Sequence, residues 1–176
     1  MGRYLVVNLF SDPVRQYHRE LVEKISDSFG VKPQKIGAHM TLIPPFESED
    51  ISEIQKISEL FVKENRRIKM TVGGIGSFRD NVIFLKIAIE EKMHGKVSNF
   101  MTAGIGKTGG EEQLNLPHVF HCTLVSRRIS HKFEAIMSSL ECETHVYSCY
   151  LDNISIMKWD EDLKKWILKH QFHLKP

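Results

Sequence analysis

One short motif occurs twice in this sequence, and the repeat constrains the fold more than any other feature. Residues 38–42 (Ala-His-Met-Thr-Leu) recur as residues 120–124 (Phe-His-Cys-Thr-Leu), with the two histidines separated by 82 positions (121 − 39). In an extended strand alternate side chains share a face, so each histidine points the same way as the threonine two positions later. The residues between them pack on the other face. The repeat therefore predicts two neighbouring strands that bring two imidazoles and two hydroxyls together.

These residue types suit chemistry on a phosphate ester. An imidazole titrates near neutral pH, so one histidine can accept a proton from water while the other donates a proton to a departing oxygen. A hydroxyl two residues along can hydrogen-bond the anionic phosphoryl oxygens. The candidate catalytic residues are His39 and His121, and the candidate phosphate-binding residues are Thr41 and Thr123. A lone His-x-Thr is common in ordinary half-buried strands, so the argument depends on the second copy.

The spaced pair of motifs resembles the 2H phosphoesterase superfamily, which is defined by two H-x-T/S-x motifs about this far apart. The superfamily includes 2′,3′-cyclic phosphodiesterases and 2′-5′ RNA ligase-like proteins, and the resemblance covers nearly the whole chain. It implies that His39 donates the proton to the leaving oxygen and that His121 is the base for water. The two tetrads are nearly identical, so the residues alone do not orient the pair.

Two further residues are candidates for substrate binding. Members of the family often carry an aromatic residue in the connection where Phe78 lies, so Phe78 is a candidate for stacking on a base; the alternative is a core aromatic at a strand end. Arg127 follows the second motif and is a candidate for binding phosphate from the edge of the site, or else a solvated residue at a strand end.

Composition indicates a globular protein without a membrane span or a disulfide framework. Of 176 residues, 41% are hydrophobic and 26% are charged, and the apolar runs are too short to cross a bilayer. The N-terminus lacks a signal-peptide pattern, and three cysteines with no C-x-x-C spacing fit a reducing compartment, so we expect a cytoplasmic protein. A net charge of +2 does not by itself indicate nucleic-acid binding, so any RNA contact must be local.

Hydrophobic periodicity predicts alternating strands and helices with no interdomain linker. Pro44 and Pro45 are expected to end the first motif strand, and residues 73–76 to lie in a hairpin connection. Residues 104–116 are expected to form a flexible loop. Strands are expected at about 3–10, 38–43, 68–72, 82–89, 119–126, 144–150, 153–159 and 164–174, and helices at about 14–29, 51–65, 91–101 and 130–140. The first motif is expected near the middle of its strand.

Two rival sites are disfavoured by the sequence. Gly106-Lys107-Thr108 matches the end of a P-loop, but the first glycine of that motif would fall on Met101, and the segment follows a helical pattern where a P-loop follows a strand. His118 falls on the strand face opposite His121, and His170 and His173 also alternate, so neither pair has convincing metal-ligand spacing.

The sequence as a whole predicts a single α+β domain over residues 1–176. Two pseudo-symmetric lobes of antiparallel sheet, with outer helices around a central cleft, would give the LigT-like architecture of the family it resembles. The predicted function is a monomeric, metal-independent and cofactor-independent phosphoesterase acting on 2′,3′-cyclic phosphate or 2′-5′ phosphodiester bonds. Its expected partner is an RNA end, a nucleotide or another small phosphodiester, with no membrane. The alternative is a nucleotide- or RNA-binding module of the same fold with little turnover.

Overall fold

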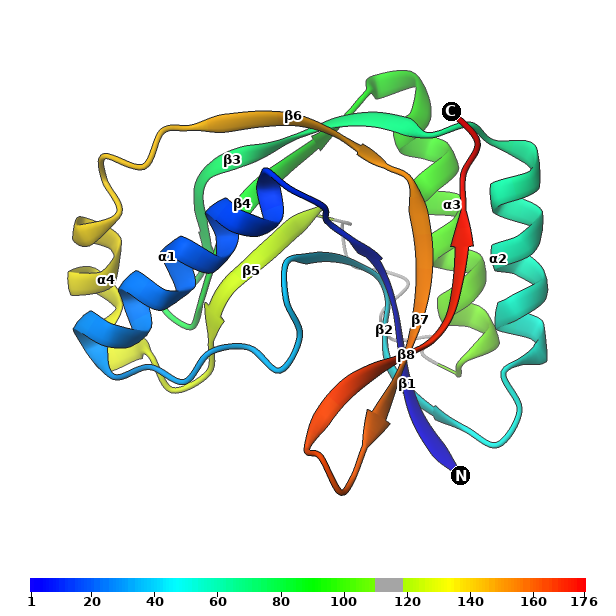
Figure 1. The fold of residues 1–176 in the computed structure, drawn as a ribbon, viewed down its shortest axis with the longest axis horizontal. Coiled ribbons are helices and arrows are strands. Elements are labelled where there is room, and N and C mark those ends of the chain that lie inside the picture. The colour runs from blue at the N-terminus through cyan, green and yellow to red at the C-terminus, as the bar shows by residue number, and fades with distance from the viewer. Residues whose placement is uncertain (110–118) are drawn as a thin grey trace.

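In the computed structural model, which describes residues 1–109 and 119–176, the chain forms two four-stranded antiparallel sheets with helices packed against them (Figure 1). The strands are β1 (Gly2–Leu9), β2 (His39–Ser48), β3 (Ile68–Phe78), β4 (Val82–Ile89), β5 (His121–Ser126), β6 (Val146–Leu151), β7 (Asn153–Asp160) and β8 (Lys165–His173). The helices are α1 (Val14–Phe29), α2 (Ser52–Glu64), α3 (Glu91–Lys107) and α4 (Phe133–Ser139), the last preceded by the short 3₁₀ turn η2 (Ser130–Lys132). None of these described helices is long and apolar enough to cross a membrane.

Each sheet places one copy of the repeated motif on an edge strand. The first sheet has the order β2-β1-β7-β8 and the second sheet has the order β5-β4-β3-β6. Strands β2 and β5 contact each other, so the two sheets meet along the strands that carry the histidines. This arrangement confirms the predicted α+β fold with two lobes.

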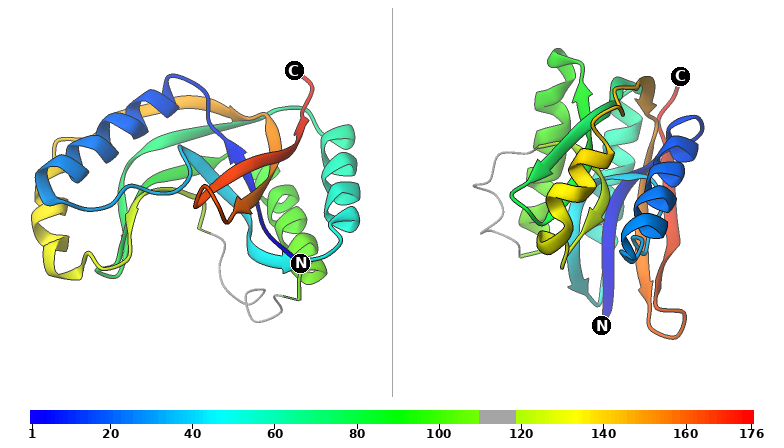
Figure 2. Two further views of the ribbon diagram at one scale, coloured as in Figure 1. Left: turned by 60° about the horizontal axis from the view of Figure 1, so that its bottom comes forward. Right: turned by 90° about the vertical axis from the view of Figure 1, so that its left-hand side faces the viewer.

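The helices cover one face of each sheet at opposite ends of the molecule. Helices α2 and α3 lie together at one end against the first sheet, while α1 and α4 lie at the other end against the second (Figures 1 and 2). The lobes do not correspond to the two halves of the sequence. The first sheet takes β1 and β2 from the start of the chain and β7 and β8 from its end, because hydrophobic alternation predicts strands but not their partners.

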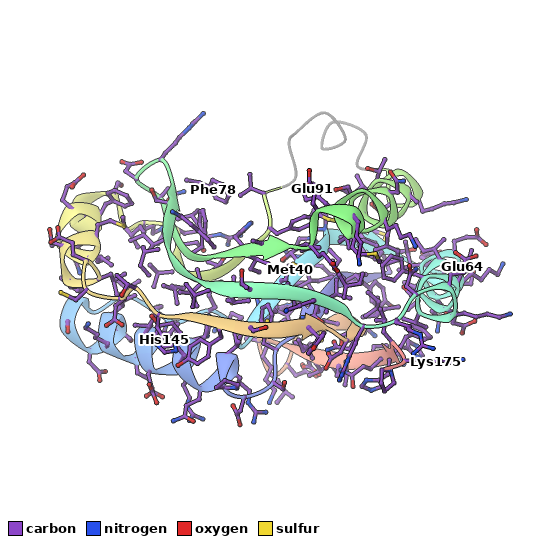
Figure 3. All side chains as sticks on the ribbon, turned by 90° about the horizontal axis from the view of Figure 1, so that it is seen from above. Met40, Glu64, Phe78, Glu91, His145 and Lys175 are labelled. Carbon is purple, nitrogen blue, oxygen red and sulfur yellow. The ribbon has the colours of Figure 1, made fainter. Side chains whose placement is uncertain are left out.

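Burial confirms the two faces predicted for the motif strands. Met40 and Leu42 on β2, and Cys122 and Leu124 on β5, are fully buried in the main hydrophobic core. Met40 lies in the middle of the molecule, between the two helical ends (Figure 3). The histidines and threonines of the repeat therefore share the opposite faces of their sheets.

The first motif strand does not end at its prolines. Strand β2 begins at His39 and runs through Pro44 and Pro45 to Ser48, so the motif lies at its start and not at its middle. Proline removes a ladder hydrogen bond, and it is tolerated on an edge strand or at a bulge. Both conditions hold here, because β2 is an edge strand and its pairing with β1 shifts register between Tyr4 and Val6, opposite the prolines.

Two glycine-rich segments are more regular than expected. Strand β3 continues to Phe78 through a bulge, where Gly73 and Gly74 have positive φ angles of 153° and 70°. Helix α3 continues to Lys107, so residues 104–107 are helical and were wrongly assigned to a loop. The lysine of the P-loop-like segment thus ends a helix, whereas a P-loop lysine begins one. Residues 108 and 109 form a turn, and residues 110–116 of that predicted loop, together with His118, lie outside the described residues.

A test of helix packing follows from the glycines of α3. Gly104 is buried, and a Cβ there would collide with the Ile43 side chain on β2, so Gly104→Ala should lower the free energy of unfolding by about 1–3 kcal/mol. Gly95, exposed on the same helix, has no atom near its added Cβ, so Gly95→Ala should raise it by about 0.5–1 kcal/mol. Urea unfolding measures both. Equal effects would show that α3 does not pack on β2 at Gly104.

Candidate active site

The site is built where the edge strands β2 and β5 meet. Strands β2 and β5 contact each other, and Cys122 on β5 is buried in the same core as Met40 and Leu42 on β2. His39 begins β2 and His121 begins β5, and each is followed on the same face by a half-buried threonine. The structure thus brings His39 and His121 close enough for their charges to interact.

The two imidazoles are held by the same hydrogen bond. Nδ1 of His39 lies 2.7 Å from the backbone oxygen of Gly37, and Nδ1 of His121 lies 2.7 Å from that of Val119, in each case two residues earlier. A carbonyl oxygen only accepts, so Nδ1–H donates in both rings. The neutral ring then carries no proton on Nε2. The repeat in the sequence therefore produces two imidazoles of the same tautomer, each with an unprotonated Nε2.

Burial distinguishes the two histidines. His39 is only 8% exposed, and this burial lowers its pKa to about 4, with the charges of His18 and His121 acting in the same direction and the hydrogen bond to Gly37 opposing them. Burial also lowers the pKa of His121, opposed by its hydrogen bond to Val119. Protonating a buried imidazole costs more free energy than protonating one in water. Both rings are therefore neutral at neutral pH.

Two aromatic rings lie beside His121, whereas no aromatic contact of His39 is found among residues 1–109 and 119–176. The ring centroid of Phe78 lies 4.9 Å from that of His121 at an edge-to-face angle of 88°, and Phe84 lies 5.1 Å from it. Phe78 is 36% exposed beside the β3–β4 turn (Figure 3), so it packs at the end of its strand and leaves part of its ring open to solvent. The residue paired with His121 on β4 is the exposed Lys86, whereas His39 pairs with Leu9 on β1.

A third histidine lies at the junction, and the sequence reasoning did not find it. His18 on α1 is buried at 4% exposure, and its Nε2 lies 2.8 Å from the backbone oxygen of Thr123, to which it donates. Its own pKa is lowered by burial. His18 falls four residues after Val14 and four before Val22, on the apolar stripe of α1, and this position was the signal that marked it as inward-facing.

The structure does not bring Arg127 to the histidines. Arg127 is exposed just beyond the end of β5, where its backbone N–H donates to the backbone oxygen of Asn81. It is six positions from His121, roughly 20 Å along an extended strand. Within residues 1–109 and 119–176, no three His, Cys, Asp or Glu side chains are grouped as metal ligands.

Comparison with known proteins agrees with this architecture. The sequence profile of the 2′-5′ RNA ligase superfamily matches residues 10–163. A Staphylococcus aureus (strain JH1) protein with a provisional phosphoesterase name is 22% identical over 174 residues, which cover 97% of this chain and 99% of that protein. A Staphylococcus aureus (strain Mu3) protein with the same provisional phosphoesterase name shows the same identity and coverage.

Solved structures share the fold at low sequence identity. The protein TT0787 of Thermus thermophilus superposes with a TM-score of 0.70 at 16% identity, covering 98% of each chain. Escherichia coli LigT in its apo form gives a TM-score of 0.64 at 14% identity, covering 99% of this chain and 98% of LigT. Its complex with 3′-AMP gives 0.66 at 14% identity and 99% coverage of both chains.

The burial of His39 makes stability depend on pH. The folded state holds this imidazole neutral down to about pH 4, whereas the unfolded chain protonates it near 6.5, so the unfolded state binds more protons between these values. Stability should therefore fall as the pH falls, by about 2 kcal/mol from His39 between about pH 7 and pH 5. Urea unfolding measures this loss, and His39→Asn should remove much of it. An unchanged slope in His39→Asn would contradict the assignment.

Proposed function

This chain belongs to the 2′-5′ RNA ligase superfamily, and on that premise we propose that it is a metal-independent phosphoesterase acting on 2′,3′-cyclic phosphate or 2′-5′ phosphodiester bonds of RNA or nucleotides. The observation that carries the proposal is the matched pair of imidazoles, each with Nδ1–H bound to a carbonyl and Nε2 free. Each imidazole is accompanied on its face by a threonine hydroxyl, Thr41 or Thr123. The LigT complex with 3′-AMP supports a nucleotide in a site of this fold.

The proposed reaction uses the two histidines for opposite proton transfers. Nε2 of His121 takes a proton from water, and the water oxygen attacks phosphorus. The bond from phosphorus to the leaving O2′ or O3′ breaks, and His39, protonated at Nε2, donates its proton to that oxygen. Protons exchanged with solvent restore both rings. The direction of the assignment follows the family resemblance, and ligation would be the reverse reaction through the same groups.

The low pKa of His39 makes this acid role depend on the substrate. A bound phosphodiester carries negative charge, which favours the imidazolium form of a ring beside it. We infer that His39 takes up its proton together with the anionic substrate. The hydroxyls of Thr41 and Thr123 donate to the phosphoryl oxygens, whose charge increases in the transition state.

The same burial favours a second candidate, a nucleotide- or RNA-binding module of this fold with little turnover. A histidine that is 8% exposed with a pKa of about 4 is a weak proton carrier at neutral pH unless the ligand raises its pKa. Binding of a 2′,3′-cyclic nucleotide without release of the monophosphate would favour the module over the enzyme.

Hydrolysis in the presence of a chelator tests the proposed enzyme. The wild-type protein, dialysed against EDTA, should convert a 2′,3′-cyclic nucleotide or a 2′-5′ dinucleotide into its monoester or nucleoside products, because imidazoles and hydroxyls supply proton transfer and charge stabilisation without a metal. Chromatography of the products measures the rate and the bond that is cleaved. Activity that is lost in EDTA and restored by a divalent ion would contradict a metal-independent mechanism.

Substitutions that keep the histidine anchors separate catalysis from packing. In His39→Asn and His121→Asn the amide can still donate to the carbonyl two residues earlier, but Nε2 is absent, so kcat should fall by about 10²–10⁴-fold in each. The double variant should be scarcely slower than the slower single variant, because both groups act on one transition state. Thr41→Val and Thr123→Val should cost about 1–3 kcal/mol each in kcat/KM.

The matched control is His131→Ala, on the exposed surface of η2, which should retain wild-type turnover. Loss of activity in His131→Ala, with activity kept in His121→Asn, would place the chemistry elsewhere.

A further inference from the structure

The second sheet has a broad exposed face that the proposed chemistry uses only at one edge. His121 lies on this face at strand β5, and the face continues over β4 and β3 to the outer edge strand β6. Strands β4, β3 and β6 run side by side (Figure 3). Along β6, alternate residues of this face are exposed: Val146, Ser148 and Tyr150.

Register places a line of residues from the histidine to the far edge. Lys86 pairs directly with His121, so both side chains lie on the same face. Two residues further along β4 the face continues with Ala88, which pairs with Thr71 on β3, and Thr71 in turn pairs with Ser148 on β6. These three side chains are short. The line from Lys86 to the far edge therefore carries no bulky side chain before Tyr150.

The line ends at a stacked pair of side chains. Lys69 on β3 pairs with Tyr150 on β6, and the guanidinium carbon of Arg67 lies 4.3 Å from the centroid of the Tyr150 ring. Tyr150 is 39% exposed. An exposed aromatic ring with an arginine plane over it is a platform on which a nucleic-acid base can stack.

The charge of this face is of one sign. No Asp or Glu occurs among the described residues of strands β3, β4, β5 and β6, whereas Lys69 and Lys86 lie on the exposed face. At the border, the carboxylate of Glu90 is paired with Lys92. The face therefore complements a chain of phosphates.

We propose that the exposed face of the second sheet binds single-stranded RNA, with Arg67, Lys69 and Tyr150 holding nucleotides that lie beyond the one at the histidines. The proposal rests on the proposed function in naming RNA as the ligand. Tyr150 lies three strands and about four residues along the sheet from His121, roughly 20 Å away at the usual spacings. A mononucleotide does not span this distance, whereas about four nucleotides do, which is the lower end of the usual site sizes for single strands. The preferred substrate is then an RNA end and not a free nucleotide.

The experiment compares a short and a long ligand on matched variants. The probes are a fluorescein-labelled single-stranded RNA of six nucleotides, the corresponding dinucleotide, and a hexanucleotide and a mononucleotide ending in a 2′,3′-cyclic phosphate. Wild-type protein should bind the hexanucleotide more tightly than the dinucleotide. Tyr150→Ala should weaken hexanucleotide binding by roughly 5-fold or more, while Tyr150→Phe, which keeps the ring, should bind like wild type. Arg67→Ala should weaken it as well and reduce its dependence on salt.

The control is Arg15→Ala, an exposed arginine on α1, which covers the opposite face of the second sheet. It should leave hexanucleotide binding unchanged. In turnover, Tyr150→Ala should lower kcat/KM for the cyclic hexanucleotide and leave that for the cyclic mononucleotide unchanged.

The outcomes separate this inference from the proposed function. Hexanucleotide binding that depends on Tyr150, without hydrolysis of any probe, supports the RNA surface and overturns the enzyme. Hydrolysis of the cyclic mononucleotide, with no gain in affinity for the hexanucleotide or no effect of Tyr150→Ala, supports the enzyme and overturns the RNA surface.

Discussion

The contact between two edge strands is the constraint on which this structure depends. Edge strands leave backbone groups without ladder partners, and proteins usually cover or charge them. Here the edges of both sheets are turned toward each other, and His18 on α1 donates to the Thr123 carbonyl of β5. One backbone group of the β5 edge, the Thr123 carbonyl, thus has a hydrogen-bond donor at the place where the two imidazoles must meet. The position of the site follows from this contact.

The repeat makes the two halves of the site alike in geometry but not in environment. The hydrogen bonds from Nδ1 are the same on both sides, at 2.7 Å to the carbonyl two residues earlier. The residues paired with the two histidines differ: His39 pairs with Leu9 on β1, whereas His121 pairs with Lys86 on β4. Two like groups in unlike surroundings acquire different pKa values, which is the usual basis for dividing acid and base roles between them. The asymmetry lies in the residues around the motifs and not in the motifs themselves.

The sequence predicted the chemistry better than the arrangement of the chain. The His-x-Thr repeat identified both motif strands and their faces, because alternation in a strand is a local rule that burial at Met40 and Leu124 obeys. Pairing between strands is not local, so the composition of each lobe was missed. His18 was missed because a lone histidine on an apolar helix stripe is usually read as a packed side chain. The prolines were wrongly expected to end β2, because the sequence does not show that β2 is an edge strand, where proline is tolerated. The glycines were wrongly expected to end α3, because the sequence does not show that Gly104 packs closely against Ile43.

The order of the strands along the chain has a consequence for folding during synthesis. All strands of the second sheet lie between residues 68 and 151, whereas the first sheet needs β1 and β2 together with β7 and β8, which follow it in the chain. Asp152 is the only residue between β6 and β7. On the ribosome, the lobe that holds His121 can form while β1 and β2 wait for their partners. The histidine motif that is translated first therefore belongs to the sheet that is completed last.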